Sequence, residues 1–157
     1  MNIIEMTVPA FCVIGKEGST ADGPGFVQRL WEDANGHFSE VEPLAERRAD
    51  GSLAGIWGAM TDLSRSFRPW EEDFTRGLYL AGIQCPQDAQ PPEGWTKWRL
   101  PGFVCLAAEC DRETVFRDML AYLEGRGLPL AGPVQDYTDP GTGKCYMLFP
   151  IRRLPED

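Results

Sequence analysis

The feature that most constrains the fold is a weak internal repeat. Residues 9–17 (PAFCVIGKE) align with residues 101–109 (PGFVCLAAE), and a turn and a helical pattern follow each of them. Two further strand-like stretches follow each helical pattern. Because the order strand, helix, strand, strand occurs twice, the sequence predicts a duplicated α+β unit.

The first half contains one helix and two apolar strands after its opening strand, which we place within residues 3–15. An apolar stripe recurs every four residues from Phe26 to Phe38, which indicates one amphipathic helix. Residues 54–60 and 77–85 alternate large and small side chains, as strands do. The stretch 77–85 is apolar on both faces, so we expect each face to be covered by a helix layer or by a ligand.

A linker separates the two halves. Residues 86–94 combine prolines and a glycine with polar residues, which is typical of a connection without regular structure. Beyond it, an apolar stripe over residues 115–123 predicts a second helix. Residues 133–138 and 144–151 predict the last two strands, which a Gly- and Pro-rich turn joins.

Length and charge limit the class of protein to which this chain can belong. With 157 residues, we expect one domain over residues 1–157, with half repeats over about residues 1–88 and 95–157. The net charge of −9 argues against a nucleic-acid-binding surface, which needs clustered Lys and Arg. No apolar run approaches the roughly 18 residues of a membrane span, and the N-terminus lacks the pattern of a signal peptide. These features predict a cytoplasmic protein that binds neither nucleic acid nor a membrane.

Cysteine and histidine usage argues against a metal site. No two of the cysteines form a CxxC pair, and the only histidine is His37. An odd number of scattered cysteines predicts free thiols in a reducing compartment rather than a disulfide framework. We therefore expect no metal, no cofactor and free thiols at all five positions, which are Cys12, Cys85, Cys105, Cys110 and Cys145.

Several short motifs occur in the order and spacing of a known family. They are residues 11–17, Gly55-Ile56-Trp57-Gly58, Tyr79-Leu80-Ala81-Gly82-Ile83, Gly94-Trp95, Gly132-Pro133 and Tyr146 with Phe149-Pro150-Ile151. Together they resemble the GyrI-like small-molecule-binding domain, also known as the effector-binding domain of AraC-type bacterial transcription activators. The resemblance covers nearly the whole chain. It is to the standalone form, because the chain leaves no room for a DNA-binding domain.

The resemblance implies both a fold and a partner. It implies two βαββ units related by a pseudo-two-fold axis, in an antiparallel sheet with helices on one side and a ligand groove on the other. Family members fused to DNA-binding domains sense drugs and other ligands. The resemblance therefore implies that this chain binds a small aromatic, drug-like molecule as its partner.

Six residues on predicted strands are candidates for ligand contacts. Aromatic side chains that project from the uncovered face of a sheet can line a concave site, where stacking and apolar area supply affinity. The family's pocket places a glutamate two residues before a strand tyrosine, and this position holds a glutamine here. The candidates are Trp57, Tyr79, Gln135, Tyr137, Tyr146 and Phe149.

The residue at position 135 bears on the charge of the ligand. The amide of Gln135 can donate and accept hydrogen bonds but carries no charge. The neighbouring Asp136 is expected to point to the opposite face, because side chains alternate along a strand. We therefore predict a neutral or weakly cationic ligand, unless Asp136 or another acid such as Glu109 reaches the groove.

Three classes of function stay open. The preferred one is a binding module that holds a small molecule without transforming it, with no catalytic residue. A second is a hydrolase that opens strained cyclopropane-containing genotoxins, as some standalone GyrI-like proteins do with a pocket glutamate and an aromatic partner. Gln135 argues against it, since Glu17, Glu32 or Glu109 would have to supply the acid. A third, also associated with the family, is an inhibitor or partner of gyrase.

Overall fold

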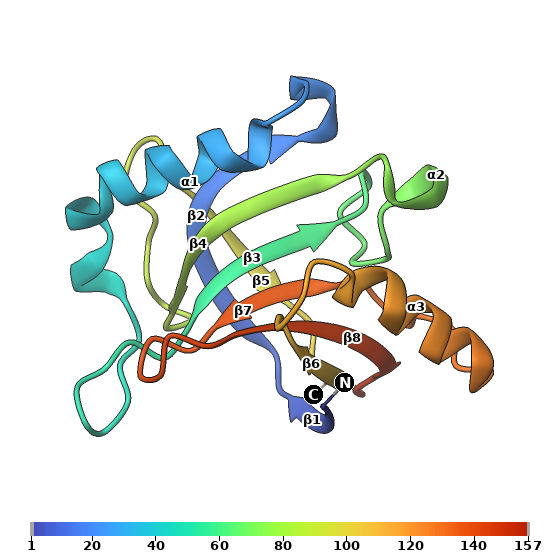
Figure 1. The fold of residues 1–157 in the computed structure, drawn as a ribbon. Helices are drawn as coiled ribbons and strands as arrows, with labels where there is room; N and C mark the ends of the chain where they lie inside the picture. Colours follow the sequence, from blue (N-terminus) through green and yellow to red (C-terminus); the bar gives the residue numbers. More distant parts are fainter. Residues whose placement is uncertain (1, 157) are drawn as a thin grey trace.

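The structure is a computed structural model that describes residues 2–156. The strands in this range are β1 (Ile3–Val8), β2 (Phe11–Ser19), β3 (Ile56–Thr61), β4 (Leu78–Cys85), β5 (Thr96–Leu100), β6 (Phe103–Glu109), β7 (Gln135–Thr138) and β8 (Cys145–Arg153). The helices are α1 (Phe26–Gly36), α2 (Glu71–Phe74) and α3 (Val115–Gly125), with short 3-10 turns η1 (Thr20–Asp22), η2 (Phe38–Glu40) and η3 (Glu42–Leu44). The strands form one antiparallel sheet (Figure 1), so the predicted α+β class is confirmed.

The two halves of the chain meet at the middle of this sheet. The strand order is β1-β6-β8-β7-β3-β4-β2-β5. The halves join at the centre where β3 pairs with β7, from Ile56 opposite Thr138 to Gly58 opposite Asp136. They also pair at both edges, because β1 pairs with β6 and β5 pairs with β2. Each half contains a strand, a helix and two strands in that order, as predicted. The duplication itself, with its pseudo-two-fold axis, stays a prediction.

The edge strands differ from the sequence-based expectation. One strand is predicted within residues 3–15, but the structure has two, because the first strand ends at Val8 and the second begins at Phe11. β1 and β2 are therefore not neighbours in the strand order of the sheet. Pro9 lies at this break, and it has no N–H to donate to a ladder. β5 follows the predicted linker directly and pairs with β2, although the sequence does not predict a strand there.

The helices α1 and α3 cover one face of the sheet, α1 over β2 and β4 and α3 over β6 and β8 (Figure 1). Ile14, Ala81 and Ile83 pack under α1, while Ala108 and Phe149 pack under α3. None of the helices within residues 2–156 is long and apolar enough to cross a bilayer.

The opposite face of the sheet is covered mainly by its own side chains, because the sheet is strongly curved (Figure 1). Side chains from six strands form one buried cluster there, which includes Val13, Trp57, Leu80, Trp98 and Phe103. Curvature also explains the small residues of β4. A Cβ at Gly82 would collide with the backbone of Ile14 on β2, so the room that Gly82 leaves is taken by the neighbouring strand.

One buried carboxylate ties down the loop between β3 and α2. Asp62 accepts hydrogen bonds from the hydroxyl and the backbone N–H of Ser66, at 2.6 and 2.9 Å. Burial raises the pKa of Asp62, but hydrogen bonds from serine hydroxyls and backbone N–H groups outweigh it and hold the pKa well below its usual value. The two aromatics of this loop fold back onto the core, as the sequence suggests. Phe67 packs edge-on against Trp98, and Trp70 packs with the side chains under α1.

Candidate ligand-binding site

Three of the six candidate residues form a row of aromatic rings on the helix-free face. Trp57, Tyr137 and Tyr146 lie opposite one another on β3, β7 and β8. The ring centroids of Trp57 and Tyr137 are 4.7 Å apart, and those of Tyr137 and Tyr146 are 6.4 Å apart. All three rings pack against the buried cluster of that face. This row is the part of the predicted site that the structure brings together.

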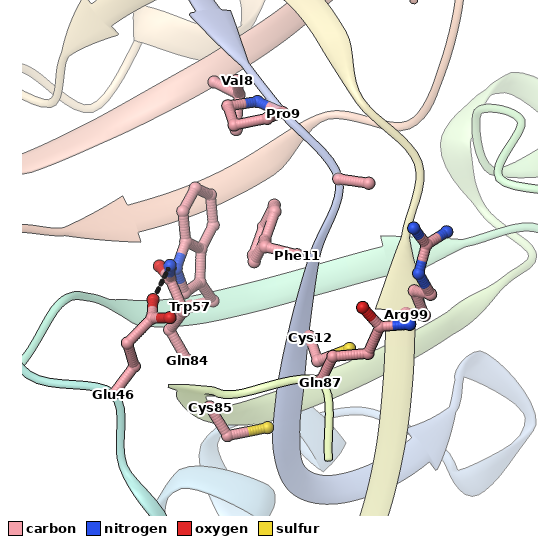
Figure 2. Close-up of a pocket in the computed structure, with 11 residues that line it drawn as sticks. Val8, Pro9, Phe11, Cys12, Glu46, Trp57, Gln84, Cys85, Gln87 and Arg99 are labelled. Carbon is pink, nitrogen blue, oxygen red and sulfur yellow. Dashed lines mark hydrogen bonds between the residues drawn. The ribbon is translucent and has the colours of Figure 1, made fainter. Parts of the chain in front are cut away.

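A hollow of about 330 Å³ opens beside Trp57 at the edge of this face (Figure 2). The indole N–H of Trp57 donates to the Gln84 side-chain oxygen at 3.0 Å, and the Gln84 amide donates to the Glu46 carboxylate at 2.7 Å. Arg99 lies on the far side from Glu46 (Figure 2). Because two charged and two amide side chains line it, this polar hollow suits a small polar molecule better than an aromatic one. It is lined by Val8, Pro9, Ala10, Phe11, Cys12, Glu46, Trp57, Gln84, Cys85, Gln87 and Arg99.

The remaining aromatic candidates, Tyr79 and Phe149, lie on the helix-bearing face. Phe149 is fully buried under α3, where its ring centroid is 6.1 Å from that of Phe116. Tyr79 is 3% exposed, and its hydroxyl accepts a hydrogen bond of 3.0 Å from the indole N–H of Trp31 on α1. Since Tyr79 and Phe149 point away from the row of Trp57, the six candidates do not line one surface.

Gln135 completes the pairing of the two central strands. Its side-chain oxygen accepts a hydrogen bond of 2.6 Å from the backbone N–H of Met60, and its amide donates to the Met60 carbonyl oxygen at 3.1 Å. The backbone ladder of β3 and β7 ends at Gly58 and Asp136, so the Gln135 amide extends it with a side chain. Both polar ends of the buried Gln135 therefore have partners within the protein.

Asp136 points to the helix-bearing face, as strand alternation predicts, and lies beside the hydroxyl of Tyr79. Burial raises the pKa of Asp136 to about 6, and the Tyr79 hydroxyl offsets part of this rise. Burial, followed by the nearby Asp136 charge, raises the pKa of Tyr79. Gly58 makes room for the pair, because a Cβ there would collide with the Tyr79 hydroxyl and contact the Asp136 side chain.

An apolar hollow of about 200 Å³ lies on the same face of the sheet. It is lined by Met60, Trp70, Phe74, Phe116, Pro133, Val134 and Met147. Asp136 is not among these residues, but it is the cross-strand partner of Met147, and Tyr79 is the partner of Met60. A strained turn supplies Phe74, since Glu72, Asp73 and Phe74 all have left-handed backbone with φ between 50° and 65°. Such strain is often found at binding sites.

The helix-bearing face therefore joins two features that ligand sites commonly combine. The apolar hollow offers aromatic and methionine side chains, and Asp136, the cross-strand partner of the lining residue Met147, offers one titratable group with a perturbed pKa. The other acid candidates lie away from this hollow, and Glu109 is on the helix-free face as the cross-strand partner of Tyr146. Glu17 pairs with Arg65 at 2.7 Å, and Glu32 is exposed on α1. No group of three or more metal-ligating side chains occurs within residues 2–156.

The sequence alone does not predict the apolar hollow, because its walls come from five separate segments, which include β3 with Met60 and the stretch before β7 with Pro133 and Val134. Trp70 and Phe74 come from the loop and turn before β4, Phe116 from α3, and Met147 from β8. One signal for it is present in the sequence. Trp70 is an aromatic residue in a polar loop, and such a residue must fold back onto other apolar groups.

Comparisons with known proteins identify the fold. No protein-family model matches the sequence, and no curated protein matches it. A Staphylococcus aureus protein proposed to regulate bacterial transcription matches with a TM-score of 0.60 and 13% identity, over 97% of this chain and 99% of that one. SAV2435 bound to tetraphenylphosphonium matches with a TM-score of 0.61 and 13% identity, over 97% and 94% of the two chains. A Listeria innocua hydrolase matches with a TM-score of 0.52 and 14% identity, over 96% and 91%. At these identities the similarity shows the fold alone.

Proposed function

We propose that this chain is a standalone small-molecule-binding protein of the GyrI-like type, which holds small aromatic cations in the apolar hollow. Asp136 is the counter-ion in this proposal. The observation that carries it is the position of the desolvated Asp136 carboxyl on the helix-bearing face, where Asp136 is the cross-strand partner of the lining residue Met147.

The electrostatics favour a cation over a neutral ligand. A carboxyl with a pKa of about 6 is mostly ionised at pH 7, and its raised pKa shows that burial disfavours the charge. A cation that enters the hollow supplies the missing partner, whereas a neutral ligand only removes further water from the carboxylate. Contacts with the rings of Trp70, Phe74 and Phe116 add cation–π attraction of about 0.5–2 kcal/mol each.

The volume of the hollow sets the size of the ligand. About 200 Å³ is less than the roughly 300–1,000 Å³ of pockets that bury drug-sized molecules. A single ring with a compact cationic group, such as phenyltrimethylammonium, fits this volume. A larger ligand would extend past Phe74, which is only half buried at the rim.

Two further observations support the proposal. The motif order of the chain resembles that of effector-binding domains, which sense drugs and other ligands. In addition, one protein with the same fold was solved with tetraphenylphosphonium, an aromatic cation. The predicted aromatic row of Trp57, Tyr137 and Tyr146 stays a second candidate surface, with the polar hollow beside it.

A matched pair of variants tests the location of the site. Phe74 and Phe67 are both half-buried phenylalanines with left-handed backbone, but only Phe74 lines the apolar hollow. Phe74→Ala should weaken binding of phenyltrimethylammonium by about threefold to thirtyfold in a calorimetric titration, because it removes one ring from the wall. Phe67→Ala should leave the affinity unchanged. Equal losses in both variants, or a loss only in Phe67→Ala, would place the ligand elsewhere.

A hydrolase is the second candidate function, and the Asp136–Tyr79 contact is the observation that favours it. In the addition of water to a strained ring, the ionised Asp136 carboxylate can act as general base, and the Tyr79 phenol beside it can act as proton donor. A hydrolase from Listeria innocua shares the fold. Styrene oxide tests this reading: formation of the diol by wild-type protein and its loss in Asp136→Asn would support it. Equal rates of diol formation with and without the protein would contradict the hydrolase function.

A further inference from the structure

Four of the five cysteines stand in two cross-strand pairs. Cys12 on β2 lies directly opposite Cys85 on β4. Cys110 lies one position beyond Glu109 at the end of β6, and its backbone N–H donates to the carbonyl oxygen of Cys145 on β8 at 2.9 Å. Each pair therefore places two thiols on one face of the sheet, since directly opposed residues share a face.

The two pairs differ in their access to solvent. Cys12 and Cys85 are 2% and 3% exposed under α1, whereas Cys110 and Cys145 are both exposed. Thiol–disulfide exchange requires that an oxidant reach the sulfur, so burial protects the first pair and leaves the second open. The buried pair is thus an internal control for the exposed one.

The backbone geometry at Cys110 and Cys145 suits a disulfide. Opposed residues of an antiparallel pair have Cα atoms about 4.5–5.5 Å apart, and disulfides span Cα separations of about 4.4–6.8 Å. The backbone hydrogen bond between Cys110 and Cys145 therefore holds the two residues at a separation that a disulfide can span. We propose that Cys110 and Cys145 form a redox-active dithiol, which low-molecular-weight disulfides oxidise to an intramolecular cross-strand disulfide.

The surroundings of the two thiols assign their roles. The Thr138 hydroxyl oxygen lies 3.3 Å from the Cys145 sulfur, where it can donate a hydrogen bond to a thiolate. Although Cys110 is exposed as a residue, desolvation, the Asp136 charge and the neighbouring Cys145 raise its pKa to about 11. Cys145 is therefore the attacking thiol, and Cys110 is the thiol that resolves the mixed disulfide.

The reaction consumes one oxidant molecule. The Cys145 thiolate attacks one sulfur of glutathione disulfide, whose S–S bond breaks, and one glutathione thiolate leaves with the electron pair. Cys110 then gives its proton to solvent and attacks the Cys145 sulfur, which expels the second glutathione thiolate. The two cysteines are oxidised to one disulfide, and glutathione disulfide is reduced to two glutathione thiols.

Thiol counting on the folded full chain tests this site. After exposure to glutathione disulfide and denaturation, wild-type protein should lose two of its five reactive thiols, leaving three. Peptide mapping should find the lost pair as Cys110 linked to Cys145 within one chain. A link between Cys12 and Cys85, a disulfide between two chains, or five remaining thiols would overturn the proposal.

Single serine variants at the two exposed positions distinguish the attacking thiol from the resolving thiol. Cys110→Ser should trap glutathione on Cys145, because the resolving thiol is gone. In Cys145→Ser, glutathione should attach to Cys110 roughly tenfold or more slowly than it attaches to Cys145 in Cys110→Ser. The reason is that the raised pKa of Cys110 leaves little thiolate. Equal rates of attachment in the two variants would contradict the assigned roles, and the disulfide in wild-type protein is measured separately.

Discussion

The Asp136 carboxyl lies beside the Tyr79 hydroxyl where the two halves of the sheet meet, above Gly58. Trp31 of α1 donates its indole N–H to the same hydroxyl, so the hydroxyl proton of Tyr79 is free to point toward Asp136. The contact therefore links α1 and both halves of the sheet to the edge of the apolar hollow.

Burial of Asp136 predicts a pH dependence of stability. Its pKa is raised from 3.8 to about 6 in the folded protein, so the folded state binds more protons than the unfolded state between these pH values. The free energy of unfolding should therefore fall as pH rises from about 4 to 6, by on the order of 2–3 kcal/mol for this group. Urea unfolding of wild-type protein and Asp136→Asn at both ends of this range measures the difference.

The asparagine variant should lack this part of the pH dependence, because its amide does not titrate. Asp88→Asn is the matched control, since Asp88 is exposed in the linker and should behave as wild type. If Asp136→Asn shows the same loss of stability with pH as wild type, Asp136 does not titrate with a raised pKa.

The close contact at Gly58 predicts that this position does not tolerate a larger residue. Gly58→Ala should lower the free energy of unfolding by about 1–3 kcal/mol, because the added methyl group collides with Tyr79. Gly36→Ala is the control, since no atom lies within 4 Å of a Cβ built at this helix end. Denaturant midpoints compare the two variants, and equal stability would show that the sheet relaxes around position 58.

The sequence predicts much of the fold because its signals are local. Alternation of large and small residues marks β3 and β4, and four-residue periodicity marks α1 and α3. β1 and β5 are missed as separate strands, since their partners are remote in sequence and only the break at Pro9 hints at the first of them. Pairing with a remote strand, rather than local pattern, decides such edge strands.

The candidate site is harder to predict for a related reason. Alternation correctly places Tyr137 and Asp136 on opposite faces, but it does not say which face adjoins a hollow. The helix-free face looks open from the element count alone, whereas the curved sheet fills it with residues such as Trp98 and Phe103. Curvature is a property of the whole sheet, so no single stretch of sequence reports it.

The hydrogen bonds of Gln135 with Met60 give a test of its predicted role as a ligand contact. Gln135→Glu should destabilise the protein by about 1–3 kcal/mol, because a carboxylate cannot donate to the Met60 carbonyl oxygen. Its affinity for phenyltrimethylammonium should stay unchanged if the ligand lies on the face of Asp136. A clear gain in cation affinity at unchanged stability would instead place Gln135 at the centre of the site, as the sequence predicts.

The most direct test compares a cation with its neutral isostere at one carboxyl. Phenyltrimethylammonium and tert-butylbenzene differ only in a nitrogen that replaces a carbon, so their affinities report the charge alone. At pH 7.5 wild-type protein should prefer the cation by roughly tenfold, which corresponds to about 1.4 kcal/mol. Asp136→Asn should lose this preference while it still binds tert-butylbenzene. A preference for the cation that survives in Asp136→Asn, or wild-type protein that favours tert-butylbenzene, would contradict the role of Asp136 as the counter-ion.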